Sequence, residues 1–498
     1  MPPRAAAAPR GETPIGVVDI VAGLALATAW VAVVRPGGLD LPFFWDEADV
    51  YVPGSVWVAD HGLDVTPGVF PDDYSRGHPP LLYLLAGAAF AAFGASPTVG
   101  HALVLPFTVA ALAGTYLLGA QLFDRRAGAA AALGLGVTPL FMSMGNMLLP
   151  EMPLTALAVL SFLALARGRV GVAAALGAAA VLMKETGIFA AAGVGAAVLF
   201  DAWQQKTLRT RAGALRVALS TAPLWALGLF FVWQKGTAGY FVYPHHANLF
   251  ADRPFEAANL VTVFPSLLAW HGRWALGLGA VLAVGIASRQ TTSAPAPAPL
   301  ARWTPSRAAV LVGALVLGLA NAAFFAKMFW LERYALPVHP LLLVAACGAL
   351  FRPATPERAT PAHALPWVPV LATALLGALS MRAPTTADSE EHTFAYADVI
   401  ATHRAAFEGL DRPGARVLTT WPMTVELRHA YLGYVARDTE APDARYLEPG
   451  DDVAFTDAVV NPSSDLADAV RDRARRRGMR LRSTHRVGVA PPLERWGP

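Results

Sequence analysis

The stretch FFWDEADVY, residues 43–51, places three carboxylates within four positions, directly after the first long apolar segment. Charged groups beside a membrane are costly to desolvate unless they bind something, so acids here indicate a functional site. The alternative interpretation is that Asp46 and Glu47 are solvated charges of a polar loop. The fold class follows from the way apolar segments and polar loops alternate on either side of this stretch.

The composition is that of a polytopic membrane protein. Of 498 residues, 55% are hydrophobic and 15% are charged, and the mean hydropathy is +0.43. Soluble proteins carry about 25% charged residues. No small-residue cleavage site follows the first apolar run, which predicts a retained helix and not a removed signal peptide. The single cysteine, Cys347, excludes a disulfide within the chain and a cysteine metal cluster.

Apolar segments recur along the first three quarters of the chain. A helix needs about 20 apolar residues to cross a hydrocarbon core of roughly 30 Å. Several segments are shorter, so we expect about 11 transmembrane helices, within a range of about 9–13. The expected spans are 15–34, 97–121, 127–145, 152–166, 169–183, 186–200, 215–233, 260–287, 306–326, 334–351 and 365–381.

The placement of charge gives an expected orientation. The first outer segment, 35–96, is acidic, whereas the next connections on the opposite side are basic. The charges are Asp40, Asp46, Glu47, Asp49, Asp60, Asp64, Asp72 and Asp73 with Arg35 and Arg76 in the first loop, and Arg125, Arg126, Arg167, Arg169, Lys206, Arg209, Arg211 and Arg216 opposite. Because Lys and Arg concentrate on the cytoplasmic side, we expect a multi-pass protein of the plasma or inner membrane with a cytoplasmic N-terminus.

Residues 79–94 are apolar but too short to cross comfortably, and they lie between Pro79-Pro80 and Gly94. We expect a helix on the outer membrane surface. A span here would invert every later loop.

The composition changes after residue 381. Residues 382–498 are rich in acids and arginines, with strand patterns at 416–421 and 453–460 and an amphipathic helix pattern at 465–477. We therefore expect a transmembrane domain over 1–381 and a small extracytoplasmic α/β domain over 382–498. The expected role of the second domain is structural or acceptor-handling.

Five polar motifs are expected at the same membrane face. They are Asp46-Glu47, the Arg76-Gly77-His78-Pro79-Pro80 turn, Glu151 before Met152-Pro153, Lys184-Glu185, and Glu332-Arg333-Tyr334. Each has a simpler interpretation. Glu151 would cap a helix, His78 would belong to a turn, Lys184 and Glu185 would form a local ion pair, and Arg333 would reach the headgroups.

Together these motifs resemble the class C (GT-C) membrane glycosyltransferases. The features are an Asp-Glu pair after the first span, HPPL at 78–81, a lone acid before MPL at 152–154, Lys184 after the fifth span, and Arg333-Tyr334 before Pro337. The chain is most similar to the dolichyl-phosphate-mannose protein mannosyltransferases and lipid A aminoarabinose transferases, the family 39 type. The resemblance covers about 15–350. The chain departs from the pattern at Glu151, where many relatives have Asp, at Asp49, where the aminoarabinose transferases tend to have a basic residue, and at His78, where some have Lys.

The resemblance implies transfer of a sugar from a polyprenyl-phosphate donor to an acceptor hydroxyl on the extracytoplasmic face, with inversion. Asp46 is the expected base. Glu47 and Glu151 are expected to orient the acceptor or to share a divalent cation, whose candidate ligands are Asp46 and Glu151. Lys184 and Arg333 would stabilise the leaving phosphate. Arg76, His78 and Tyr334 are further candidate substrate-binding residues.

The expected partners are the lipid-linked donor, the bilayer, and a protein, lipid or glycan acceptor, with no nucleic acid. Two other classes stay open: a multi-pass transporter or lipid flippase, and a catalytically inactive structural relative. Transporters usually hold coupling charges in broken helices at mid-membrane, whereas the charges here cluster at one face behind a large outer loop. The enzyme is therefore the favoured interpretation.

Overall fold

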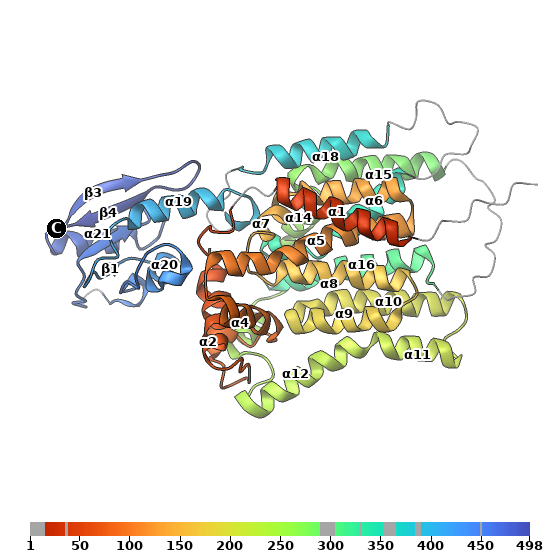
Figure 1. The fold of residues 1–498 in the computed structure, drawn as a ribbon, viewed down its shortest axis with the longest axis horizontal. Helices are drawn as coiled ribbons and strands as arrows, with labels where there is room; N and C mark the ends of the chain where they lie inside the picture. Colours follow the sequence, from red (N-terminus) through yellow and green to blue (C-terminus); the bar gives the residue numbers. More distant parts are fainter. Residues whose placement is uncertain are drawn as a thin grey trace, which may run out of the picture.

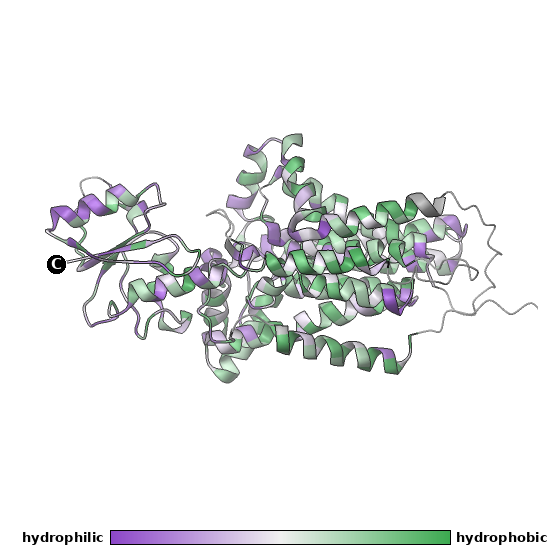
Figure 2. Cartoon of the chain, turned by 90° about the horizontal axis from the view of Figure 1, so that it is seen from above, coloured by the Kyte–Doolittle hydropathy of each residue, from purple (hydrophilic) through white to green (hydrophobic). Residues whose placement is uncertain are grey.

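The computed structural model describes residues 15–34, 38–288, 304–328, 330–351, 365–383, 390–448 and 451–498. Its apolar helices lie side by side in a bundle, and a small sheet domain lies at one end (Figure 1). Hydrophobic residues run along the bundle, whereas hydrophilic residues gather in the sheet domain, at its junction with the bundle and at the opposite end (Figure 2). This distribution is that of a helical membrane protein.

Each expected span contains at least one helix. The bundle helices are α1 Val17–Val34, α5 Pro97–Leu122, α6 Arg125–Gly136, α7 Pro139–Met144, α8 Glu151–Ala166, α9 Val170–Met183, α10 Ile188–Gln204, α11 Arg211–Ser220, α12 Ala222–Ala238, α14 Leu260–Leu268, α15 Arg273–Ser288, α16 Arg307–Lys327, α17 His339–Leu350 and α18 Trp367–Leu379. By length and composition, four described helical stretches could each cross a membrane, one of them the kinked stretch Ala257–Val284. The number is five if the bent α11–α12 pair counts as one, and six apolar helices are shorter. The number eleven stays a prediction.

At least three expected spans are not continuous helices, and one of them, 215–233, bends between α11 and α12. The segment 127–145 breaks between α6 and α7, where Thr138 adopts an extended conformation before Pro139, because proline disfavours helix in the preceding residue. The segment 260–287 breaks between α14 and α15, where His271 has φ 54°. The last two breaks have local causes that hydrophobicity alone does not reveal.

Small residues let the bundle helices approach closely. A Cβ added at Gly128 of α6 would lie 2.3 Å from the carbonyl oxygen of Tyr116 in α5. A Cβ at Gly193 of α10 would lie 2.6 Å from the carbonyl oxygen of Gly313 in α16. Such contacts are how helices pack where lipid supplies no hydrophobic driving force.

The first outer segment folds into short helices at the end of the bundle nearest the sheet domain (Figure 1). These are α2 Val52–Asp60, α3 Asp72–Ser75 and α4 Leu81–Phe93. The segment expected to form a surface helix is helical over 13 residues and ends at Gly94, whose φ is 82°. Its place at the membrane surface stays a prediction. α4 packs on α2, since a Cβ at Gly87 would lie 2.7 Å from Val58.

The sheet domain contains helix α19 Tyr396–Phe407, helix α20 Met423–Arg428, helix α21 Ala467–Arg476 and four strands, β1 Val417–Leu418, β2 Asp457–Val460, β3 Arg480–His485 and β4 Leu493–Gly497. The strand order is β1-β2-β4-β3, with β1 and β2 parallel and the other pairs antiparallel. The core contains Leu418, Val460 and Val470. Both expected strands and the expected helix are present, whereas the β3–β4 hairpin was not expected.

The sheet domain packs on the stretch 43–51. The Phe43 N–H donates to the Leu432 carbonyl oxygen at 3.0 Å. The ring of Trp45 lies 4.5 Å, centroid to centroid, from that of Trp421. The first outer segment and the sheet domain therefore share one end, while the connection between α10 and α11 lies at the other (Figure 1). Arg35, part of the charge argument, lies outside the described residues.

Candidate active site

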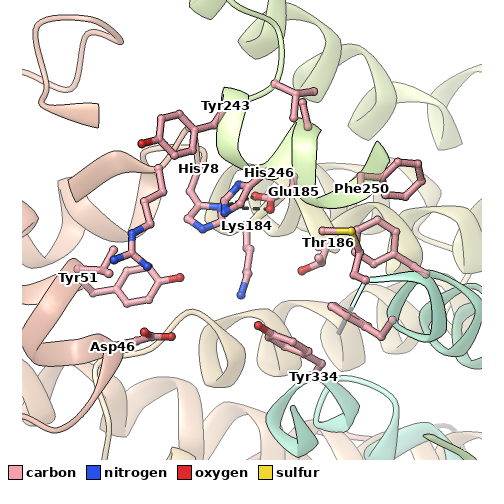
Figure 3. A pocket seen from close by; sticks show the side chains of 18 of the residues that line it. Asp46, Tyr51, His78, Lys184, Glu185, Thr186, Tyr243, His246, Phe250 and Tyr334 are labelled. Carbon is pink, nitrogen blue, oxygen red and sulfur yellow. Dashed lines mark hydrogen bonds and ion pairs between the residues drawn. The ribbon is translucent and has the colours of Figure 1, made fainter. Parts of the chain in front are cut away.

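A cavity of about 500 Å³ opens between the first outer segment, the α9–α10 connection, α12, the following helix α13 (Pro244–Asp252), and the η5 turn (Glu332–Ala335). Six of the eight expected site residues line it: Asp46, Arg76, His78, Lys184, Arg333 and Tyr334. Asp46, Lys184 and Tyr334 point toward the same space (Figure 3). The lining also includes the aromatic side chains of Phe231, Phe250, Phe324 and Phe325.

Arg333 connects the carboxylates around this cavity. Its Nη2 donates to Asp46, and its Nη1 lies 2.8 Å from Glu391 Oε2. Its Nε lies 3.7 Å from Oε1 of Glu151, and the same oxygen accepts a hydrogen bond from Lys184 Nζ at 2.8 Å. Arg333 is 3% exposed. Three carboxylates thus surround two cations, with Glu151 behind Lys184 and not on the cavity surface.

Glu47 does not reach the cavity. Its carboxylate accepts the backbone N–H of Phe44 at 3.1 Å and that of Leu148 at 2.5 Å, and it lies 3.2 Å from Nε2 of His101. The side chain is 1% exposed. The expected catalytic role of Glu47 therefore lacks support in the geometry. The residue instead ties the backbone beside Asp46 to α5 and to the α7–α8 connection.

The backbone around Asp46 is held from both sides. Trp45 adopts a left-handed conformation with φ 53°, and the π-helix η1, Glu47–Tyr51, begins directly after Asp46. π-helical turns are rare and occur often at functional sites. Trp45 lies against Trp421 of the sheet domain, so this domain contributes to the direction in which Asp46 points.

The environment shifts the pKa values of two carboxyl groups in opposite directions. Burial opposes ionisation of Asp46, but the adjacent Arg333 guanidinium outweighs it and lowers the pKa below its usual value. Burial, then the neighbouring carboxylates Asp46 and Glu151, raise the pKa of Glu391 to about 7 against the effect of Arg333. Asp46 is therefore ionised at neutral pH, whereas Glu391 titrates near neutral pH.

Arg76 and His78 also line the cavity, and both have acidic partners. Arg76 Nη2 is 2.9 Å from Asp49 Oδ2, and His78 Nδ1 is 2.9 Å from Glu185 Oε2. Lys184 and Glu185 bond different partners, so the local ion pair considered for them is not the arrangement found. The partner of His78 lies 107 positions away in the sequence. A residue that only forms a turn needs no such long-range contact, so His78 does more than shape the turn.

Comparison with known proteins adds the class of chemistry. Residues 77–230 match the model of the family described as dolichyl-phosphate-mannose-protein mannosyltransferase. The matched segment covers about a third of the chain and identifies it as a membrane glycosyltransferase. That family is described by a lipid-phosphate-sugar donor, dolichyl-phosphate-mannose, and the transporter alternative is not favoured. No curated protein sequence matches the chain.

Two similar solved structures support the fold of the glycosyltransferase. The apo crystal structure of ArnT from Cupriavidus metallidurans has 17% sequence identity and a TM-score of 0.56, with 96% of this chain and 97% of that chain covered. ArnT from the same organism bound to undecaprenyl phosphate has 15% identity, the same TM-score and the same coverage. The likeness extends over the bundle and the sheet domain alike.

The described residues of this glycosyltransferase do not fit a divalent cation shared by Asp46 and Glu151. Among them, no group of three or more His, Cys, Asp and Glu side chains could hold a metal ion. Both candidate ligands bond cationic side chains, Asp46 to Arg333 and Glu151 to Lys184. Oxygen-ligated cations need several free ligands, so no catalytic step is assigned to a metal here.

Three residues of the cavity region were not expected from the sequence. Tyr243 and His246 belong to an aromatic stretch, YFVYPHH at 240–246, that would have been a usable signal. Burial lowers the pKa of His246 to about 4, so its ring is neutral where it faces His78 at 5.2 Å. Glu391 gave no signal, because it lies among the ordinary charges of the second domain.

Proposed function

We propose that this glycosyltransferase moves a sugar from a polyprenyl-phosphate donor to an acceptor hydroxyl on the extracytoplasmic face of the cell membrane, inverting the anomeric carbon. The observation that carries the proposal is the arrangement of one cavity: a carboxylate, Asp46, faces two cations, Lys184 and Arg333, beside aromatic side chains. This combination suits a hydroxyl acceptor, a phosphate and a lipid chain together. The ArnT structure with bound undecaprenyl phosphate supports a donor of this class.

Asp46 acts as the general base. It accepts the proton of the acceptor hydroxyl as that oxygen bonds to the anomeric carbon. The bond between this carbon and the donor phosphate oxygen breaks, and its electron pair leaves on the phosphate. The lowered pKa of Asp46 keeps this carboxylate ionised at neutral pH, so that it can accept the proton.

Lys184 and Arg333 stabilise the charge that develops on the leaving phosphate. Arg333 suits this role, because a guanidinium binds phosphate through two parallel N–H groups. Its Nε and the Oε2 of Glu151 are buried without a hydrogen-bond partner among the described residues. Buried polar groups are normally paired, so the unpaired Nε–H of Arg333 suits a cavity in which a bound phosphate supplies the acceptor.

The remaining expected residues have supporting roles. Glu151 holds Lys184 toward the cavity. Tyr334 stacks on Phe325 with centroids 4.2 Å apart, and its ring lies 4.9 Å from Lys184 Nζ. Arg76 and His78 contact the donor or acceptor in the cavity.

The orientation is also part of the proposal. The cavity and the sheet domain share one end of the bundle, which we assign to the extracytoplasmic side. The α10–α11 connection with Lys206 and Arg209 lies at the other end (Figure 1), which we assign to the cytoplasm with the N-terminus.

The test is incubation of purified protein in liposomes with a panel of radiolabelled polyprenyl-phosphate sugars. Release of polyprenyl phosphate with labelled acceptor supports the proposal and identifies the sugar. Movement of the intact donor across the bilayer would indicate a carrier. A donor that is neither cleaved nor moved would indicate a structural relative without activity.

A further inference from the structure

A three-residue turn connects the sheet domain to the cavity. This turn, η7 (Glu390–His392), precedes α19, and two of its residues contact two consecutive residues of η5. Glu391 Oε2 lies 2.8 Å from Arg333 Nη1, and His392 Nε2 lies 3.8 Å from Glu332 Oε2. Glu391 is 4% exposed.

Both halves of this contact are anchored further. Ser143 of α7 donates its hydroxyl to the Glu391 backbone carbonyl. Glu332 Oε1 lies 3.2 Å from His271 Nε2 and 3.5 Å from Arg273 Nη2. The hydrogen bond from Ser143 thus holds the backbone that carries the Glu391 side chain. The contacts of Glu332 hold the η5 turn, which carries Arg333, beside it.

The two terminal nitrogens of Arg333 have different partners. Nη1 bonds Glu391, whereas Nη2 bonds Asp46. If Asp46 takes a proton from an acceptor and Arg333 binds a donor phosphate, the bond between Nη2 and Asp46 must be exchanged. The bond from Nη1 to Glu391 then becomes the main direct contact that keeps the guanidinium in place.

We propose that Glu391 is a positioning residue: it holds Arg333 through Nη1 while Nη2 passes from Asp46 to the donor phosphate. The proposal rests on the proposed function, because it assumes a phosphate donor in this cavity. It gives the sheet domain a definite part in transfer through one buried ion pair. Glu391 itself touches no substrate.

The test compares Glu391→Gln with the wild-type enzyme in two assays, steady-state transfer and binding of polyprenyl phosphate without sugar. Hydrogen bonds to charged groups contribute about 1.5–3 kcal/mol, so we expect the donor KM and the polyprenyl-phosphate Kd to rise by about tenfold or more. The acceptor KM stays near the wild-type value. The matched control is Glu426→Gln, which removes another buried carboxylate of the sheet domain, paired with His403 at 2.6 Å. It lowers stability without changing donor binding.

A pH profile separates positioning from a general structural effect. The charged groups that act on the Glu391 carboxyl group are Arg333, Asp46 and Glu151, whereas the Ser143 hydroxyl bonds the Glu391 backbone carbonyl. Since the pKa of Glu391 is raised to about 7, protonation on going from about pH 8 to about pH 6 weakens its bond to Arg333. The donor KM of the wild type therefore rises as the pH falls. In Glu391→Gln this dependence is lost.

The outcomes distinguish the two proposals. A wild-type enzyme that neither binds polyprenyl phosphate nor transfers sugar overturns the proposed function. A wild type that does both, with Glu391→Gln unchanged in donor KM and in pH profile, overturns only the positioning role. If Glu391→Gln does not insert, Glu391→Asp keeps the charge but withdraws it by one methylene, and an unchanged donor KM in that variant overturns the role as well.

Discussion

Arg333 donates a hydrogen bond to Asp46 across 287 positions of sequence. The acid that directly follows the stretch FFW and the arginine of the η5 turn thus share one cavity wall. A base and a phosphate-binding cation must both lie within reach of the anomeric carbon, so this contact is the geometric condition for the proposed transfer. It also means that Asp46 is occupied by a cation before substrate binds.

Asp46→Asn removes the proposed base. We expect turnover to fall by about 10²–10⁴-fold, the usual contribution of a general base, while insertion and thermal stability stay close to wild type. Transfer is measured with the radiolabelled donor, and insertion by size-exclusion chromatography in detergent. Asp60→Asn, an exposed acid at the end of α2, serves as the control and keeps full activity. Retention of more than about a tenth of wild-type turnover in Asp46→Asn would contradict the role.

Lys184→Ala removes one of the two cations beside the donor phosphate. We expect the donor KM to rise by about tenfold or more, because a hydrogen bond to a charged group is lost, with little change for the acceptor. Glu151 loses its 2.8 Å partner, and breaking a buried pair costs about 3–5 kcal/mol, so Tm falls too. Lys206→Ala, at the exposed α10–α11 connection, is the control. Equal increases in the donor and acceptor KM would rule out a donor-specific role.

Glu47→Gln separates a structural acid from a catalytic one. The amide replaces one of the two carboxylate oxygens that accept the backbone N–H groups of Phe44 and Leu148. Leaving a buried donor unpaired costs about 1–3 kcal/mol, so Tm should fall, and activity should fall with it as Asp46 loses its position. Thermal unfolding in detergent and turnover are measured on the same preparation. Lost activity at an unchanged Tm would instead place Glu47 in the chemistry.

Gly128→Ala tests the close approach of α5 and α6. The new Cβ would lie 2.3 Å from the Tyr116 carbonyl oxygen, so the helices must separate and Tm should fall. The control is Gly171→Ala in α9, where a Cβ meets nothing within 4 Å. There alanine should be neutral or stabilising by about 0.5–1 kcal/mol. Similar Tm values for the two variants would show that the α5–α6 contact is not tight.

The sequence by itself determined the elements that depend on local composition. Apolar segments of sufficient length become helices because each satisfies its own backbone hydrogen bonds in lipid, and all eleven expected segments contain helix. Isolated charges between such segments, such as Lys184 and Arg333, indicate functional residues because a charge beside the membrane is costly without a function. The strands at 417–418 and 457–460 were predicted correctly because the residue pattern of a strand is also a local property of the sequence.

The tertiary structure decided which side chains meet. Asp46 and Glu47 are neighbours of the same charge, yet one faces the cavity and the other bonds backbone N–H groups and His101, because the turn after Trp45 sends consecutive side chains in different directions. Glu391 reaches Arg333 only because η7 packs on η5. Direction and packing between distant segments are not properties of local composition, so no pattern along the chain could predict them.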